Sequence, residues 1–329
     1  MKILHLIGNG FDRNIGLKTG YEDFYYYYTQ EVETDNPIIL KLKSNISNYL
    51  KDKSISKVDW SDLEIALGKY TKEISNVDEL QEIYIDLNRN LHNYIKMQEE
   101  SVDNKGTATL MQHLVSPFHK LRAIDQNSLK PFIEKWSGIS WYVNIVTFNY
   151  TRTIEIKLTY KGSTQHALNK TPYSHQCFLQ SIKHIHGTID DAILVGVNDK
   201  SQILNDFFKI DQTALDLLVK PQSNRVIGSE IDSVCVNKIR EANLVCIFGL
   251  SLGDSDKYWW EQLGEQLKRN DFRLVYFVKG EELPIKHLIG RKIEECKKYL
   301  LSKTILSQTE KEAAKDKIFI GYNTDLFTL

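Results

Sequence analysis

Residues 1–12 read MKILHLIGNGFD, and this stretch decides the fold that we expect for the whole chain. The apolar run at 3–7 is typical of a parallel strand buried on both faces, and it ends at the turn containing Gly8 and Gly10. Such a turn before a helix lets the backbone approach a phosphate. Arg13 replaces the third glycine of a complete dinucleotide fingerprint. A tight turn that needs a positive φ therefore explains the two glycines equally well.

Composition narrows the class of protein. The 329 residues, 42% of them hydrophobic, suit one large domain with an insertion or two domains that share an interface. Lys and Arg total 42 against 43 Asp and Glu, so no general basic field recruits nucleic acid. Four widely spaced cysteines argue against a disulfide framework and a cysteine-type zinc site. No apolar stretch approaches about 20 residues, so we expect no membrane span, no signal peptide and a cytoplasmic location.

The hundred residues after the first strand–helix unit carry helical signals and almost no strand signal. Apolar residues repeat at helical spacing in four successive runs between 35 and 138. A structureless loop of this length would be unusual. We therefore predict a helical insertion at 35–138, acting as a lid or subdomain, with an α/β core formed by 1–34 and 139–329. Plain scaffolding is the alternative role for the insertion.

Strand and helix patterns alternate again after the insertion. Strands are predicted at 142–148, 181–186, 192–197, 243–248, 272–278 and 318–321, an exposed loop at 160–173, and two lysine-rich helices at 284–302 and 307–315. This alternation is typical of a doubly wound parallel sheet. The predicted fold class is α/β, a Rossmann-like doubly wound parallel sheet with a large helical insertion after the first strand–helix unit.

Four of the predicted strands end in turns rich in polar residues and glycine. The turns read GNGFD at 8–12, TFNYT at 147–151, HIHG at 184–187 and FGLSLGDSD at 248–256. The ligand crevice of an open α/β sheet lies at the carboxyl ends of its strands. All four turns therefore belong on the same rim, where they predict a nucleotide-binding site.

Two side chains on this rim are the candidate catalytic residues. The amide of Asn149 donates and accepts hydrogen bonds, so it can hold a ribose hydroxyl or a water; a turn Asn bonded to its own backbone is the alternative. His186 ends a strand and is the candidate general base or ribose contact. His184, two residues earlier on the same predicted strand face, and His5 are interpreted as structural. The H-x-H pair lacks a third ligand, so no metal is expected.

The predicted nucleotide contacts are Gly8, Asn9, Gly10, Asp12, Asp23, Gly249, Ser251 and Asp254. Gly249 allows close backbone approach, and Ser251 can bond a ribose or phosphate oxygen. A carboxylate from Asp12, Glu22 or Asp23 can stabilise positive charge, and the pattern does not choose among them. Helix capping by Asp254 or one of its two successors is a sufficient explanation for at least one of those residues.

The blocks LIGNGFD, GLKTGYEDF, VTFNYT, HIHG with GVND, and FGLSLGDSDKYWW, in this order, resemble the AbiH family of bacteriophage abortive-infection proteins. That family is distantly similar to sirtuin-type NAD-binding domains. The resemblance implies that the turn at 8–10 contacts a dinucleotide and that Asn149 and His186 serve catalysis. It also implies that Gly249 and Ser251 hold ribose.

The chain departs from the sirtuin pattern in three places. Asn149-Tyr150-Thr151 stands where sirtuin-like defence NADases usually have Asn-Tyr-Asp, and Asn9 stands where sirtuins have Ala. The four-cysteine zinc module of deacetylating sirtuins has no counterpart, so protein deacetylation is not expected.

The predicted function is phage defence through cleavage of the nicotinamide–ribose bond of NAD or a related nucleotide, with NAD as the substrate. Two other functions stay open: a nucleotide or ADP-ribose sensor without catalysis, and a metal-dependent nuclease or nucleotide hydrolase. A phage-encoded trigger and a homo-oligomer are compatible with the sequence. Neither a membrane nor a nucleic acid is expected as a partner.

Overall fold

The computed structural model of the chain describes residues 1–54, 56–283 and 285–329. One seven-stranded sheet has the order β3-β4-β2-β1-β5-β6-β7. The strands are β1 Lys2–Ile7, β2 Trp141–Thr147, β3 His166–Lys170, β4 Gln176–His184, β5 Leu244–Phe248, β6 Arg273–Val278 and β7 Ile318–Tyr322. All neighbours are parallel except β3 and β4. Without the antiparallel edge strand β3, this is the strand order of a Rossmann-like sheet, so the predicted fold class is confirmed.

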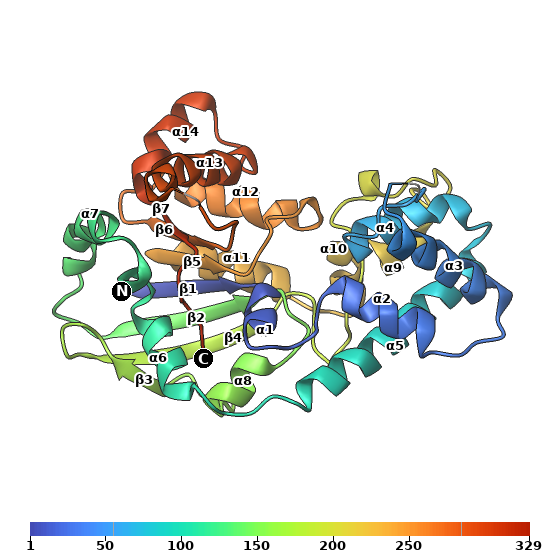
Figure 1. The fold of residues 1–329 in the computed structure, drawn as a ribbon, viewed down its shortest axis with the longest axis horizontal. Helices are drawn as coiled ribbons and strands as arrows, with labels where there is room; N and C mark the ends of the chain where they lie inside the picture. Colours follow the sequence, from blue (N-terminus) through green and yellow to red (C-terminus); the bar gives the residue numbers. More distant parts are fainter. Residues whose placement is uncertain (55, 284) are drawn as a thin grey trace.

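Helices cover both faces of the sheet and a third group lies beyond its end (Figure 1). The helices are α1 Gly10–Asn14, α2 Tyr21–Gln30, α3 Pro37–Lys51, α4 Leu63–Tyr70, α5 Val77–Glu99, α6 Thr107–Val115, α7 Ala123–Glu134, α8 Thr153–Leu158, α9 Gln212–Leu218, α10 Lys220–Val226, α11 Ile231–Glu241, α12 Lys257–Gln266, α13 Ile289–Ser302 and α14 Gln308–Ala314. None of the helices within the described ranges is long and apolar enough to cross a membrane.

The central strand β1 divides the core between the two faces. Ile3 and Ile7 pack with α6, α7 and α8, whereas Leu4 and Leu6 pack with α11, α12 and α13. Successive side chains of a strand point to opposite faces. Because both faces are covered, β1 reads as an apolar run rather than as an alternating pattern.

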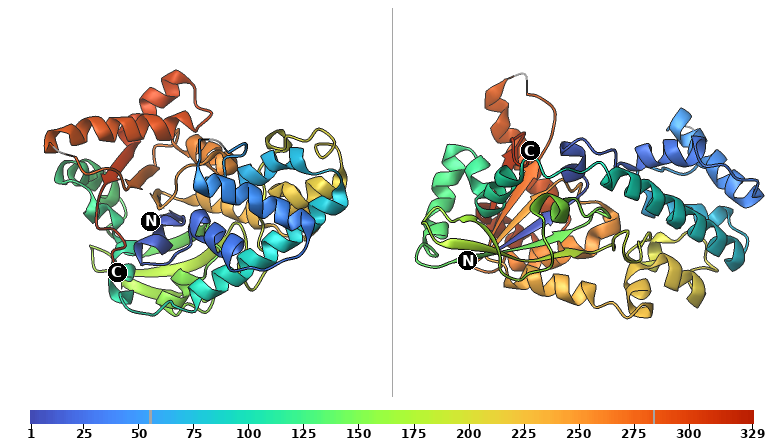
Figure 2. Two further views of the ribbon diagram at one scale, coloured as in Figure 1. Left: turned by 45° about the vertical axis from the view of Figure 1, so that its right-hand side comes forward. Right: turned by 90° about the horizontal axis from the view of Figure 1, so that it is seen from below.

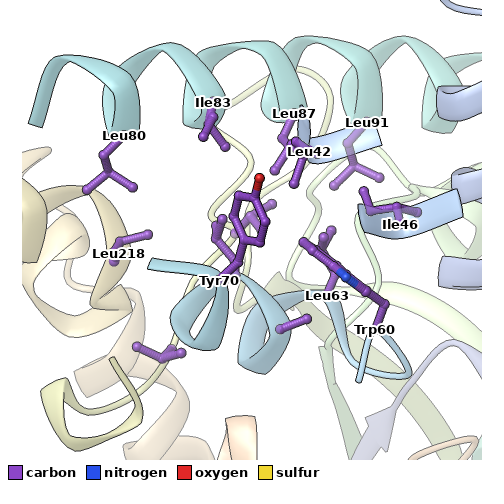
Figure 3. Packing of buried hydrophobic residues seen from close by; sticks show 14 of the residues in the cluster. Leu42, Ile46, Trp60, Leu63, Tyr70, Leu80, Ile83, Leu87, Leu91 and Leu218 are labelled. Atoms are coloured by element: carbon purple, nitrogen blue, oxygen red, sulfur yellow. The ribbon is translucent and has the colours of Figure 1, made fainter. Parts of the chain in front are cut away.

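A separate hydrophobic core joins α2, α3, α4, α5, α9 and α10, which we call the helical layer. It lies beyond the carboxyl end of β1, at the right of Figure 1, and Figure 2 shows the same separation from below. Figure 3 shows the packing that forms this layer: Leu80, Ile83, Leu87 and Leu91 line one side of α5, and Ile83 and Leu87 lie over Tyr70 of α4. All five side chains are almost completely buried.

Packing within the predicted insertion is not uniform. The division of the chain into an α/β core, 1–34 and 139–329, and an insertion, 35–138, stays a prediction. Helices α3 to α5 pack in the helical layer, but α6 and α7 pack on the sheet. Conversely, α9 and α10 lie outside 35–138 and join the helical layer.

Two predicted segments are wrong. The run 192–197 is not a strand; it makes an isolated bridge from Val197 to Val219 and buries Ile193 and Val195 in the helical layer. These apolar residues are buried, as their pattern indicates, but they pack against helices and not in the sheet. The expected loop 160–173 contains β3, a polar edge strand with one buried side chain, Leu168.

The limits of one predicted strand and the start of one predicted helix also differ from the observed ones. The strand predicted at 181–186 is β4, which begins five residues earlier, at Gln176, and ends two residues earlier, at His184. The predicted start of the first lysine-rich helix, Pro284, lies outside the described residues, and α13 runs from Ile289 to Ser302.

The last residues of the chain pack beside the end of β1. The ring centroid of Phe327 lies 5.4 Å from that of Phe11 and 5.0 Å from that of Phe248. The backbone N–H of Phe327 donates to Nδ1 of His113 at 2.9 Å, and its carbonyl accepts from Nδ2 of Asn14 at 2.7 Å. The C-terminal segment thereby holds α1 against the end of β5 and against α6.

Candidate functional site

The turns after β1 and β5 meet at the point where the strand order reverses. The N–H of Gly10 donates to the carbonyl of Gly249 at 2.9 Å. A Cβ on Gly10 would lie 2.5 Å from Cα of Gly249, and a Cβ on Gly8 would lie 2.4 Å from Cδ2 of Leu250. Gly249 has a φ of +70°. The contact between the two turns therefore requires all three glycines, whether or not a nucleotide binds there.

Four other predicted contact residues hold loops on this rim. The amide of Asn9 bonds both the carbonyl and the hydroxyl of Thr19. The carboxylate of Asp23 accepts from the N–H of Gly20 at 3.2 Å and caps α2. The carbonyl of Ser251 accepts from the hydroxyl of Tyr299 at 2.9 Å.

Asp254, the last of these four, points away from the interior. Its side chain is 74% exposed and pairs with Lys303 at 2.9 Å. A carboxylate in this position is solvated, so it adds little to the field inside the rim.

Asp12 and Asn149 come together beneath the TFNYT turn. Asp12 is 1% exposed, and its Oδ2 accepts from the Thr151 hydroxyl at 2.6 Å. Burial raises the pKa of Asp12 to about 6, although the hydrogen bond from Thr151 and the neighbouring Thr153 and Asn149 side chains oppose that rise. Within the described part of the chain, Oδ1 of Asp12 and Oδ1 of Asn149 are buried without a hydrogen-bond donor. Two such acceptors side by side are suited to a water or a sugar hydroxyl.

His184 positions this turn. Its Nδ1 lies 2.9 Å from the carbonyl of Asn149, and its Nε2 lies 2.7 Å from Oε1 of Glu155. Burial favours the neutral ring, but the Glu155 carboxylate and the Asn149 carbonyl raise the pKa of His184. Because β4 ends at His184, the alternation stops there, and His186 has different partners. The expectation that both imidazoles share a strand face is therefore wrong.

His186 belongs to a buried group of charges that we call the Lys220 cluster: His186, Lys220, Glu64, Asp256 and Tyr150. Nζ of Lys220 lies 2.6 Å from Oε2 of Glu64 and 3.4 Å from both Oδ1 of Asp256 and Nε2 of His186. His186 Nε2 lies 3.3 Å from Asp256 Oδ1, and the Tyr150 hydroxyl donates to Oε1 of Glu64 at 3.3 Å. Glu64, Lys220 and His186 are all less than 5% exposed.

The pKa values of the ionisable side chains in the Lys220 cluster are shifted in different directions. Burial lowers the pKa of Lys220, but Asp256 and Glu64 outweigh burial and raise it. Burial also acts to raise the pKa of Asp256, yet Lys220 and His186 lower it to about 2. Burial raises the pKa of Glu64 against the attraction of Lys220. Asp256 is thus the firm counter-ion, and Glu64 is the carboxylate that takes up a proton more readily.

A cavity of about 200 Å³ opens on one side of the Lys220 cluster. His186, Lys220, Asn198, Asp232, Tyr258 and Trp259 contribute to its wall. Among the described residues, Nδ1 of His186 and Nδ2 of Asn198 are buried without a hydrogen-bond partner. Trp259 is 2% exposed and supplies a flat apolar wall. Polar groups without partners beside an aromatic wall are the features of a small ring-binding site.

Sequence reasoning found His186 and missed its partners. Tyr150 and Asp256 stand inside the quoted turns, but Asp256 was explained by helix capping. It is the N-cap of α12 and makes no side-chain cap bond, because its carboxylate is engaged by His186 and Lys220. Glu64 and Lys220 are 156 positions apart and carry no local signal. Across residues 1–54, 56–283 and 285–329, no group of three or more His, Cys, Asp or Glu is placed to hold a metal ion.

Comparison with known proteins gives one finding. A family model described as "Bacteriophage abortive infection AbiH" matches residues 4–278, from within β1 to the end of β6, and includes all four rim turns. No curated protein matches the chain.

Proposed function

The chain belongs to the AbiH family of bacteriophage abortive-infection proteins, and from this phage-defence role we propose that it hydrolyses the nicotinamide–ribose bond of NAD in the cytoplasm of an infected cell. The observation that supports the proposal most is the pair of unpartnered buried acceptors, Asp12 Oδ1 in α1 and Asn149 Oδ1 in the turn after β2, beyond the ends of the adjacent parallel strands β1 and β2. The Lys220 cluster and its cavity lie on the other side of the same TFNYT turn.

The reaction needs few groups. NAD⁺ and water give ADP-ribose, nicotinamide and one proton, through a sugar centre that carries positive charge as the bond breaks. Asn149 orients the attacking water or a ribose hydroxyl, and the carboxylate of Asp12 stabilises the charge and takes the water proton. A pKa of about 6 leaves Asp12 mostly ionised at neutral pH while it stays a usable base.

The cavity beside His186 suits the nicotinamide end of the substrate better than its phosphates. Its surroundings combine the carboxylates of Glu64, Asp256 and Asp232 with a single ammonium, Lys220. The formal charge therefore favours a cationic pyridinium ring over an anion. Trp259 supplies a wall for the ring, and Asn198 supplies an unmatched amide donor for its carboxamide oxygen.

The helical layer completes this site. Glu64 comes from α4 and Lys220 from α10, whereas His186 and Asp256 come from the sheet side. Any rearrangement of the layer therefore changes the charges around His186. This arrangement gives a phage-encoded trigger a way to control NAD loss.

The test measures NAD in infected cells that carry either the wild type or Asn149→Ala, because infection supplies any trigger. Asn169→Ala, an exposed position of β3, is the matched control. We expect NAD depletion, with nicotinamide released, in cells that carry the wild type or the control. In cells that carry Asn149→Ala, the rate of nicotinamide release should be at least tenfold lower. The purified protein is assayed beside it for nicotinamide release with magnesium and with a chelator.

Three results would overturn the proposal. If the wild type protects an infected culture from phage while the NAD concentration stays unchanged, NAD cleavage is not the cause of the protection. Retained protection in Asn149→Ala, with tight NAD binding and no turnover, would indicate a sensor. Strictly magnesium-dependent degradation of nucleic acid or nucleotides would indicate a metal-dependent hydrolase.

A further inference from the structure

A second, larger cavity lies in the helical layer, away from the rim turns, and opens to solvent beside the exposed Val226. It has a volume of about 600 Å³ between α5, the segment 192–194, α9 and α10, and we call it the α5–α10 cavity. Its apolar wall includes Tyr84, Ile193, Leu217 and Val226. Cavities of roughly 300–1,000 Å³ with mostly apolar walls and a few placed polar groups are typical of small-molecule sites.

We propose that the α5–α10 cavity binds a small amphiphile with an apolar body and one anionic head, and that this ligand controls the Lys220 cluster. The site is separate from the NAD reaction, and its ligand chemistry does not depend on that reaction.

The head group follows from the polar atoms of the wall. Asn88 and Arg89 are neighbours on α5, and both line the cavity. Nδ2 of Asn88 is buried without an acceptor among the described residues, and no carboxylate of the described chain pairs with Arg89. Two further polar side chains of the wall are engaged: His92 Nε2 lies 2.9 Å from the carbonyl of Ile189, and Asp216 Oδ1 accepts from Gln212 at 2.6 Å. Two unmatched donors call for an anionic acceptor such as a carboxylate.

One connection from this cavity to the Lys220 cluster is α10. The helix has seven residues; Lys220 begins it, and Val226 ends it in the cavity wall. Ser223, between them, also lines the cavity, and its hydroxyl donates to the carbonyl of Asp216 at 2.7 Å. A helix of two turns moves as a unit, so a ligand against Val226 displaces or fixes Lys220.

The other connection is the segment 192–194. Its residues line the cavity, and the N–H of Leu194 donates to the carbonyl of His186 at 2.9 Å. Lys220 and His186, which lie 3.4 Å apart, are therefore each attached to a wall of the same cavity. A ligand in the cavity contacts both α10 and the segment 192–194. Two sites are coupled when a ligand at one of them makes different contacts in the two states of the protein, and these two walls supply such contacts between the cavity and the Lys220 cluster.

The first experiment measures binding by titration calorimetry on the full-length protein, with decanoate as the probe and decyltrimethylammonium as its cationic counterpart. We expect wild type to bind decanoate at least tenfold more tightly. Arg89→Glu should reverse that preference, whereas Arg225→Glu, an exposed α10 position outside the cavity wall, should leave it unchanged. Absence of decanoate binding, or equal binding of the two probes, would overturn the proposal.

The second experiment tests the coupling by hydrogen–deuterium exchange. With decanoate bound, residues 254–260 should exchange several-fold more slowly, since Asp256 contacts Lys220 although this segment does not line the cavity. Lys220→Met should still bind decanoate and should lose this protection. Binding in wild type without any change at 254–260 would refute the coupling. Because neither readout involves NAD turnover, failure of the NAD proposal leaves both results interpretable.

Discussion

Replacing Asp12 by Asn should stabilise the protein at neutral pH. The side chain is buried, and burial raises the pKa of Asp12 from 3.8 to about 6. A difference of about two pKa units corresponds to about 3 kcal/mol at 1.36 kcal/mol per unit. Because the folded-state pKa is the higher one, this contribution is fully present below pH 4 and is lost as the pH rises through 6. Ionised Asp12 therefore makes the folded state less stable at pH 8.

The Asn side chain fits the same hydrogen bonds. Its Oδ1 still accepts from the Thr151 hydroxyl, which lies 2.6 Å from Asp12 Oδ2. Its new amide N–H has an expected partner in Oδ1 of Asn149, because the Asn149 side chain is close enough to lower the pKa of Asp12 and its Oδ1 has no donor within the described chain. The substitution thus removes a buried charge without leaving a new polar group unpaired.

The assay is urea unfolding of wild type and Asp12→Asn at pH 4 and at pH 8. We expect nearly equal stability at pH 4 and a gain of up to about 3 kcal/mol for the variant at pH 8. Asp52→Asn is the control, since hydrogen bonds from Ser54 lower the pKa of this exposed carboxyl and the small effect should have the opposite sign. A loss of stability at pH 8, or a gain that does not change with pH, would refute the reasoning. Nicotinamide release should fall in the same variant.

Three further substitutions test the packing of the fold. Lys220→Met leaves Glu64 buried without its cation and should cost about 3–5 kcal/mol in urea unfolding, part of which the added change Glu64→Leu should restore. Gly10→Ala forces a Cβ against the backbone of the turn at Gly249 and should lower the free energy of unfolding by about 1–3 kcal/mol. The affinity of the folded variant for decanoate, measured by titration calorimetry, should not change. Phe327→Ala removes the ring that packs on Phe11 and should cost about 3–5 kcal/mol, measured by thermal unfolding.

The sequence is most informative where a strand is buried on both faces. The runs at β1, β2, β5, β6 and β7 are apolar and short, and each was placed correctly. The run 192–197 is equally apolar, but it is buried among helices, and periodicity alone does not distinguish these two environments. Strand β3 was missed because an edge strand with one inward side chain has almost no hydrophobic pattern.

The residues of the candidate site could be predicted only where a polar side chain comes directly after a strand in the sequence. His186 and Asn149 were identified by their position after apolar runs, and both lie at the carboxyl end of the sheet. Glu64 and Lys220 are brought together by tertiary packing across the helical layer, so no spacing in the chain indicates their pairing. Asp256 shows a different limit, since a residue type that suits a helix cap hides its other role.

The central place of β1 also shapes how the chain must fold during synthesis. This strand is made first, but its neighbours β2 and β5 begin at Trp141 and Leu244. At roughly 5–20 residues per second, the ribosome completes β5 about 10–50 s after β1. During that time an apolar strand has an open edge, which is a site for aggregation. Helices α2 to α5 form contacts between near neighbours in sequence and follow β1 immediately, so they can fold while β1 waits for its partners.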